Sequence, residues 1–132
     1  MKEGWLDDDY IILFEEKSDS LQEAYALMDF LPGYHLIGLL GWDDFIVEND
    51  RGVLFTVPTV PLLKQHLRQL DMDLFHAELV ADEGKTGQIK WYIKPVCFSG
   101  DPNVGPNVQW VTLEHHTQLV KWWNQKYREL AS

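Results

Sequence analysis

Three short apolar runs, separated by turn-forming residues, constrain the fold of this chain more than any other feature. They occupy residues 35–40, 44–48 and 53–57. Each has the length of a β-strand, and Asn49-Asp50-Arg51-Gly52 supplies residues that tolerate the positive φ of a tight hairpin. The pattern therefore predicts an antiparallel β-meander. Pro58 and Pro61 lack a backbone N–H, so we expect them to end the third strand or to place it at a sheet edge.

Helical patterns flank the meander. Ser20-Leu21-Gln22-Glu23 has the form of a capping box, and apolar residues continue at helical spacing as far as Leu31. Because Pro32-Gly33 ends this pattern, we predict a helix over residues 20–31. A second helix is predicted over residues 113–130 with Thr112 as its N-cap. Its apolar face would hold His116, Leu119, Val120, Trp123, Tyr127 and Leu130.

The segments between these elements give weaker patterns. Leu63, Leu67 and Leu70 have helical spacing and predict a short helix over residues 62–70. Residues 71–88 are polar and contain two glycines, so a loop is expected there. Strands are predicted over residues 88–98 and 108–111, separated by turn-forming residues. Together the elements predict one α+β domain over residues 1–132, with a mainly antiparallel central sheet, an N-terminal helix and a long C-terminal helix packed on it.

Negative charge is concentrated at the start of the chain. Residues 1–50 carry thirteen carboxylates and two lysines, whereas residues 51–132 carry eight carboxylates and nine lysines or arginines. The first part therefore has a formal charge of −11 and the rest +1, which gives the total of −10. A nucleic acid or an anionic membrane needs clustered basic residues, so neither is an expected ligand. A basic protein is the electrostatically complementary partner.

The cellular compartment follows from what the sequence lacks. Cys97 is the only cysteine, which excludes an intramolecular disulfide and fits a reducing compartment. The first residues contain no apolar signal-peptide core, and no apolar run approaches the length of a membrane span. We therefore expect a cytoplasmic protein with no membrane association.

Trp42 is the most informative of the six tryptophans. It lies in Gly41-Trp42-Asp43-Asp44, at a predicted turn between strands. A large aromatic residue beside two carboxylates suits an anchor for a basic surface, although a tryptophan folded back over the sheet edge is an equal alternative. Trp91, Trp110 and Trp123 have positions that predict core packing. The predicted partner-binding residues are Trp42 together with Asp7, Asp8, Asp9, Glu15, Glu16, Asp43, Asp44, Glu48 and Asp50.

Catalytic and metal-binding chemistry receive little support. Asp43, Asp44, Glu48 and Asp50 could supply oxygens to a divalent cation, but neighbouring residues on a strand point to opposite faces. His35, His66, His76, His115 and His116 lack the His-Glu-x-x-His spacing of a zinc site. Cys97 has no base near it in the sequence and is predicted to be a buried strand residue. No catalytic residue, metal or cofactor is predicted.

One family resemblance is present. Leu31-Pro32-Gly33-Tyr34, Trp42-Asp43-Asp44-Phe45-Ile46-Val47 and Gly52-Val53-Leu54-Phe55 resemble the corresponding segments of the SUKH superfamily, the cell-wall-assembly-regulator-like immunity proteins. Members of that superfamily are largely α+β proteins that bind and neutralise bacterial toxins, many of them nucleases. The chain departs from the family pattern because a predicted strand follows Tyr34 and the Asn-Gly-Gly motif is missing. The resemblance implies an antitoxin-like protein that occludes a cognate basic toxin without catalysis.

Three other functions remain open from the sequence. A small metal-dependent hydrolase would use the acidic and histidine residues in a cleft. An acidic mimic of nucleic acid would present rows of carboxylates along one face. An adaptor domain would bind another protein without neutralising it.

Overall fold

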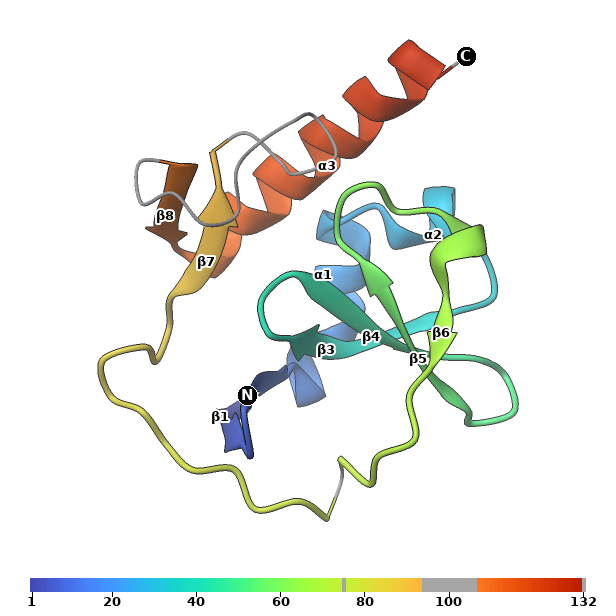
Figure 1. Ribbon diagram of the computed structural model, residues 1–132. Coiled ribbons are helices and arrows are strands. Elements are labelled where there is room, and N and C mark those ends of the chain that lie inside the picture. The colour runs from blue at the N-terminus through green and yellow to red at the C-terminus, as the bar shows by residue number, and fades with distance from the viewer. Residues whose placement is uncertain (75, 94–106, 132) are drawn as a thin grey trace.

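A six-stranded antiparallel sheet organises the molecule (Figure 1). The computed structural model describes residues 1–74, 76–93 and 107–131. Across the sheet the strands are β1 (Lys2–Leu6), β2 (Asp9–Leu13), β3 (His35–Leu40), β4 (Asp44–Glu48), β5 (Leu54–Pro58) and β6 (Arg68–Gln69). The predicted meander is therefore confirmed as β3, β4 and β5. Asn49 closes the β4–β5 turn, because its side-chain oxygen accepts the N–H groups of Arg51 and Val53.

The predicted N-terminal helix is divided into short pieces. A 3₁₀ helix, η1 (Glu15–Lys17), is followed by α1 (Ser18–Ala24) and α2 (Leu27–Phe30). The break falls at Ala26, whose φ of 57° is left-handed and cannot continue a right-handed helix. Because α1 begins at Ser18, Ser20 lies inside the helix and its hydroxyl donates to the carbonyl of Lys17. The predicted capping box is therefore wrong.

One further prediction from the first two-thirds of the chain needs correction, and one hairpin was missed. The helix predicted over residues 62–70 is only a 3₁₀ turn, η2 (Lys64–His66), followed by β6. Pairing of Arg68 with Thr56 extends the backbone there, so the sheet overrides the helical spacing of the leucines. The β1–β2 hairpin was not predicted from the sequence. It turns at Asp7 and Asp8, and Asp7 has a φ of 54°.

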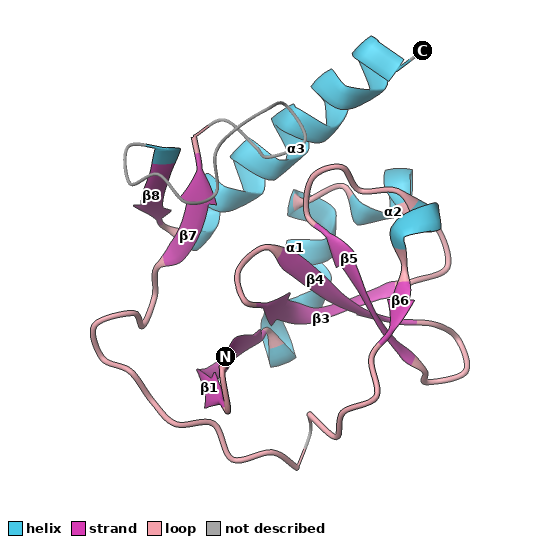
Figure 2. Ribbon diagram, in the orientation of Figure 1, coloured by secondary structure: helices cyan, strands magenta, loops and turns pink. Residues whose placement is uncertain are grey.

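The C-terminal part forms a second, smaller unit beside the sheet (Figure 2). Strands β7 (Ile89–Tyr92) and β8 (Val108–Val111) pair with each other, and α3 (Leu113–Ala131) follows. Thr112 caps α3 as predicted, since its hydroxyl oxygen accepts the N–H of His115 at 3.2 Å. Trp110 and Leu130 were predicted for the core but are 39% and 65% exposed. Cys97 and the rest of the predicted strand after residue 93 lie outside the described residues.

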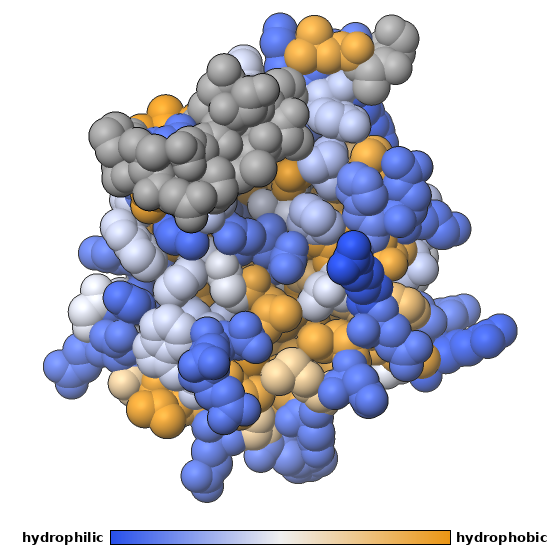
Figure 3. All heavy atoms as spheres, viewed as in Figure 1, coloured by the Kyte–Doolittle hydropathy of each residue, from blue (hydrophilic) through white to orange (hydrophobic). Residues whose placement is uncertain are grey.

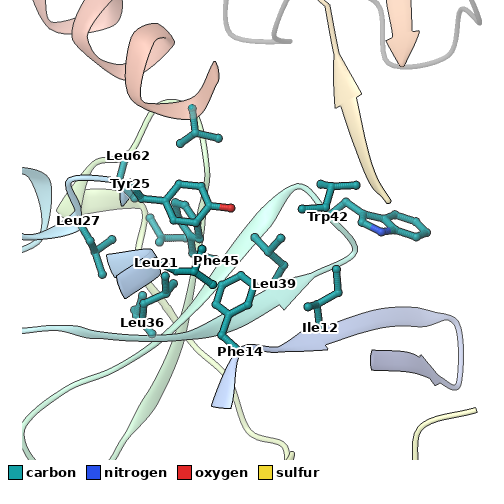
Figure 4. Packing of buried hydrophobic residues seen from close by; sticks show 14 of the residues in the cluster. Ile12, Phe14, Leu21, Tyr25, Leu27, Leu36, Leu39, Trp42, Phe45 and Leu62 are labelled. Atoms are coloured by element: carbon teal, nitrogen blue, oxygen red, sulfur yellow. The ribbon is translucent and has the colours of Figure 1, made fainter. Parts of the chain in front are cut away.

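The main core lies between the helices and one face of the sheet. Side chains at alternate positions of β2, β4 and β5 point into it, as the pleat of a strand requires. In β3 the core residues are Leu36 and Leu39, because the register shifts between Leu36 and Gly38. Tyr25, Phe14, Phe45 and the other labelled residues interlock there (Figure 4). Ile89, Trp91 and Val111 from β7 and β8 and Val120 from α3 belong to the same cluster. The small C-terminal unit is thus part of one continuous core, and the α+β fold is the predicted one.

A connector without regular strands or helices covers the opposite face of the sheet. We use "the connector" for the described residues of this segment, 70–74 and 76–80. Leu74 is fully buried against a second cluster that includes Ile11, Leu13, Ile46 and Leu54. The connector also touches β1, because Trp5 and Val80 exchange two backbone hydrogen bonds of 2.8 Å. Both faces of the sheet are therefore covered by protein.

Candidate functional site

The predicted partner-binding carboxylates divide between two opposite ends of the sheet. Ile11 pairs with Leu40, and the N–H of Gly41 donates to the carbonyl of Tyr10. The β1–β2 and β3–β4 turns are therefore neighbours. We define "the carboxylate end" as the sheet end that carries Asp7, Asp8, Asp9, Asp43 and Asp44. Glu15, Glu16, Glu48 and Asp50 lie at the other end, about 17 Å away for five-residue strands.

At the carboxylate end, the three residues of the β1–β2 turn are exposed. Asp7, Asp8 and Asp9 all lie in the exposed class, and no described residue pairs with their side chains. Three adjacent free carboxylates produce a local negative potential that would attract a basic surface. Figure 3 shows that hydrophilic residues cover most of the face seen in Figure 1, with hydrophobic residues between them.

Asp43 faces the C-terminal unit. One carboxylate oxygen accepts the hydroxyl hydrogen of Tyr92 at 3.4 Å and lies 3.9 Å from the ammonium of Lys90. Partial burial raises the pKa of Asp43 above its ordinary value, although Lys90 and Tyr92 act in the opposite direction. This residue therefore has protein partners already, and it connects the β3–β4 turn to β7.

Asp44 points to the other face of the sheet, as expected for adjacent residues where a strand begins. It lines an open pocket of about 450 Å³ between β4, β5, η2 and β6, together with Thr56, Gln65, His66 and Arg68. Partial burial raises the pKa of Asp44, and the nearby charge of Asp43 raises it further, whereas Arg68 lowers it. Asp43 and Asp44 are thus too differently placed to chelate one cation.

Trp42 is part of the core edge, which agrees with the second of the two predicted alternatives. Its side chain is 8% exposed. The ring stacks on Tyr10 with centroids 4.7 Å apart, and the edges of Trp5 and Trp110 meet it at 5.9 and 5.1 Å. Figure 4 shows it beside Ile12 at one end of the cluster. So deeply packed a ring offers little surface to a partner.

A serine–histidine pair lies at the opposite end of the sheet and was not predicted. The ring Nε2 of His35 is 2.9 Å from the hydroxyl of Ser18, beside an open pocket of about 370 Å³. The hydroxyl hydrogen of Ser18 is directed at the carbonyl of Leu36, so His35 donates to the serine oxygen. A base must accept that hydrogen to activate a nucleophile. The two hydrogen bonds of Ser18 therefore connect α1 to β3 and do not activate the Ser18 hydroxyl as a nucleophile.

A second buried histidine joins three elements. His116 of α3 is fully buried, and its Nδ1 is 2.7 Å from the hydroxyl of Tyr25. The ring also meets the edge of Trp91 from β7, with centroids 5.4 Å apart. Burial lowers the pKa of His116 to about 3, and His115 adds to this effect. The ring is therefore neutral at physiological pH and serves the core.

Sequence reasoning found some of these residues and missed others. The positions of Asp43 and Asp44 on opposite faces were predicted. Lys90 and Tyr92 were not identified as site residues, although their spacing of two on a predicted strand places them on one face. Arg68 and His66 gave no usable signal, because the leucines around them predicted a helix. Across residues 1–74, 76–93 and 107–131, no group of three or more His, Cys, Asp or Glu could hold a metal ion.

The fold and the charged site define the class of the chain as a compact α+β domain with an acidic sheet end. Comparison with known proteins assigns no family to the chain. No protein-family model matches the chain, and no curated protein or solved structure gives a significant match. Within the described residues, no helix is both long enough and apolar enough to cross a membrane.

Proposed function

We propose that this protein binds a basic partner protein through the carboxylate end of its sheet and occludes the partner's surface. The observation that carries this proposal is the position of Asp7, Asp8 and Asp9, three exposed carboxylates in one turn beside a second acidic turn. Charged groups at the rim of an interface speed the encounter of complementary partners and exclude partners of like charge. Binding of this kind requires no catalytic group or cofactor.

The expected partner is a toxin, such as a nuclease, and the protein is its immunity protein. This part of the proposal rests on the resemblance of residues 31–34, 42–47 and 52–55 to SUKH proteins. The charge distribution is compatible with it, because an inhibitor of a nuclease must cover a surface that attracts phosphates. Under this proposal the protein acts in the cytoplasm of the cell that produces the toxin. It binds the toxin there before the toxin can damage that cell.

Within this proposal we assign different roles to the predicted binding residues, according to where they lie. Asp7, Asp8 and Asp9 would steer the basic partner electrostatically. The charge of Asp43 would add to the negative potential that these three carboxylates produce. Trp42 would support the shape of the acidic turn from beneath. Glu15, Glu16, Glu48 and Asp50 lie at the far end of the sheet, so one partner surface of ordinary size would not need to reach them.

A pair of charge-matched variants tests the location of the binding surface. One variant is Asp7→Asn, Asp8→Asn, Asp9→Asn, and the other is Glu15→Gln, Glu48→Gln, Asp50→Asn. Each removes three negative charges, and all six side chains lie at the surface or partly exposed. Tagged wild-type protein and both variants are used to capture partners from the native source at low and high salt, and the captured proteins are identified by mass spectrometry.

We expect the wild type and the far-end variant to capture the same basic protein, with capture lost as salt rises. The variant at residues 7–9 should lose it. With this protein and its captured partner both purified, the association rate constant should fall at least tenfold for that variant alone. A tenfold change corresponds to about 1.4 kcal/mol in the free-energy barrier to association. Equal losses for the two variants would exclude the carboxylate end. A captured protein whose activity is unaffected by binding would exclude the immunity role.

A further inference from the structure

The pocket between β4, β5, η2 and β6 contains opposite charges that the protein leaves apart. Asp44 and Arg68 both line it, and they attract each other electrostatically. No ion pair within 4.0 Å joins them, although both belong to the described residues. A carboxylate and a guanidinium that face one cavity without contact leave space for a ligand between them.

The other polar side chains of the pocket are also without protein partners. Thr56, Gln65 and His66 line the same space, and none of them makes a side-chain hydrogen bond to another described residue. The Nδ1 atom of His66 is buried, which makes the absence of a partner costly unless something else supplies one. The volume of about 450 Å³ lies in the range of small-molecule sites, and the polar side chains in it could fix the orientation of a ligand.

From this arrangement we infer that the pocket binds a small zwitterion of the amino-acid class, with its ammonium group at Asp44 and its carboxylate at Arg68. Arg68 can hold a carboxylate through two parallel hydrogen bonds. Thr56 and Gln65 can donate to or accept from the polar atoms between the two ends. Asp44 belongs to the carboxylate end, but the inference does not depend on the proposed partner protein. Asp7, Asp8 and Asp9, which carry that proposal, do not line the pocket.

Ligands of other charge fit the pocket less well. A simple anion would be attracted by Arg68 but repelled by Asp44. A simple cation would be attracted by Asp44 but repelled by Arg68. A metal ion would find one carboxylate and one imidazole among the lining residues, fewer than the ligands that metal sites use. Only a ligand with both charges satisfies both residues.

The experiment uses the full chain and nuclear magnetic resonance of its backbone amides. Four zwitterions of increasing length, glycine, β-alanine, γ-aminobutyrate and ε-aminocaproate, are titrated separately. Butylamine and butyrate serve as probes with one charge each. We expect saturable shifts confined to residues 44, 56 and 65–68, with a Kd of about 1–10 mM for the best length. The single-charge probes should bind at least about tenfold more weakly.

Variants with matched controls locate the two charges. Asp44→Asn and Arg68→Gln should each weaken binding of the best zwitterion by at least about tenfold. Asp50→Asn and Arg51→Gln make the same changes in the β4–β5 turn and should leave binding unchanged. Arg68 is exposed, so its variant keeps the fold even where that of Asp44 does not. Absence of saturable shifts for all four zwitterions, equal binding of butylamine or butyrate, or an equal loss in the control variants would overturn the inference.

Discussion

At the scale of single residues, Trp42 combines an unfavourable backbone conformation with an extensive set of aromatic contacts. Its φ of 63° is left-handed, which costs a residue with a side chain about 1–2 kcal/mol. Contacts with Tyr10, Trp5 and Trp110 offset this cost, because each aromatic pair contributes about 0.5–1.5 kcal/mol beyond its buried area. The conformation of the turn that carries Asp43 therefore depends on packing beneath it.

Replacing Trp42 should consequently destabilise the whole protein. We expect Trp42→Ala to lower the free energy of unfolding by about 3 kcal/mol, as measured by chemical denaturation. Trp122 is 54% exposed on α3 and provides the matched control. Its replacement by alanine should change the same free energy by less than about 1 kcal/mol. A smaller effect at Trp42 than at Trp122 would mean that the ring is not part of the core.

At the scale of elements, the connector shows that an irregular segment can perform the role of a helix. The connector places Leu74 over the face of the sheet that the helices leave uncovered. Lys2 donates to the carbonyl of Ala77 at 2.9 Å, and Trp5 bonds to Val80, so the last part of the segment is attached to β1. The hydrophobic gain comes from the area removed from water and is indifferent to secondary structure.

The connector should therefore be as sensitive to mutation as an ordinary core element. Leu74→Ala removes a fully buried side chain and should cost about 2–5 kcal/mol of unfolding free energy. Val80→Ala lies in the same segment, but the Val80 side chain is 67% exposed, so its cost should stay below about 0.5 kcal/mol. Thermal and urea unfolding of the two variants provide the comparison. Similar, small effects for both would show that the segment does not cover the sheet.

The elements also show where sequence reasoning succeeds. β3, β4 and β5 were predictable because short apolar runs alternate with clear turn residues. β1 was missed because Lys2–Leu6 holds only two large apolar residues, Trp5 and Leu6, which is too little for a pattern. β6 was missed because Leu63, Leu67 and Leu70 have helical spacing, and only the pairing of Arg68 with Thr56 decides otherwise. Local spacing predicts an element when no distant strand competes for it.

At the scale of the whole molecule, the sequence showed which part of the chain carries the negative charge. It could not show that the fold separates these carboxylates into two groups at opposite ends of the sheet. All the predicted carboxylates lie within the first 50 residues, which suggests one acidic region. The pairing of Ile11 with Leu40 brings residues 7–9 beside residues 41–44 and sends Glu15 and Glu16 to the other end. This pairing joins residues far apart in the chain, so no local pattern encodes it. The candidate site was therefore only partly predictable.

His116 makes the stability of the whole molecule depend on pH. The folded protein holds this ring neutral down to a pKa of about 3, whereas the unfolded chain binds a proton below about pH 6.5. The unfolded state therefore binds more protons between these values, and stability falls as the pH is lowered from 6.5 towards 3. The slope from this residue alone is at most about 1.4 kcal/mol per pH unit.

A comparison of variants isolates this contribution. Raised pKa values of Asp43 and Asp44 act with the opposite sign, since they stabilise the fold most at low pH and lose that effect as pH rises. The informative quantity is therefore the difference between the wild type and His116→Gln in unfolding free energy at several pH values. We expect the wild type to lose more stability than the variant between about pH 6.5 and 4. His115→Gln, on the exposed side of α3, removes only the lesser cause of the lowered His116 pKa and should stay close to the wild type.

The two margins of the six-stranded sheet limit how another chain can join it. The outer side of β1 is bridged by Val80, and β6 at the opposite margin is only two residues long. Addition of a foreign strand needs a row of unpaired backbone N–H and C=O groups, and neither margin offers a long one in the described part of the chain. A partner that meets this sheet must then be recognised through side chains and their charges. Recognition of that kind can be retuned one substitution at a time, without rebuilding the backbone.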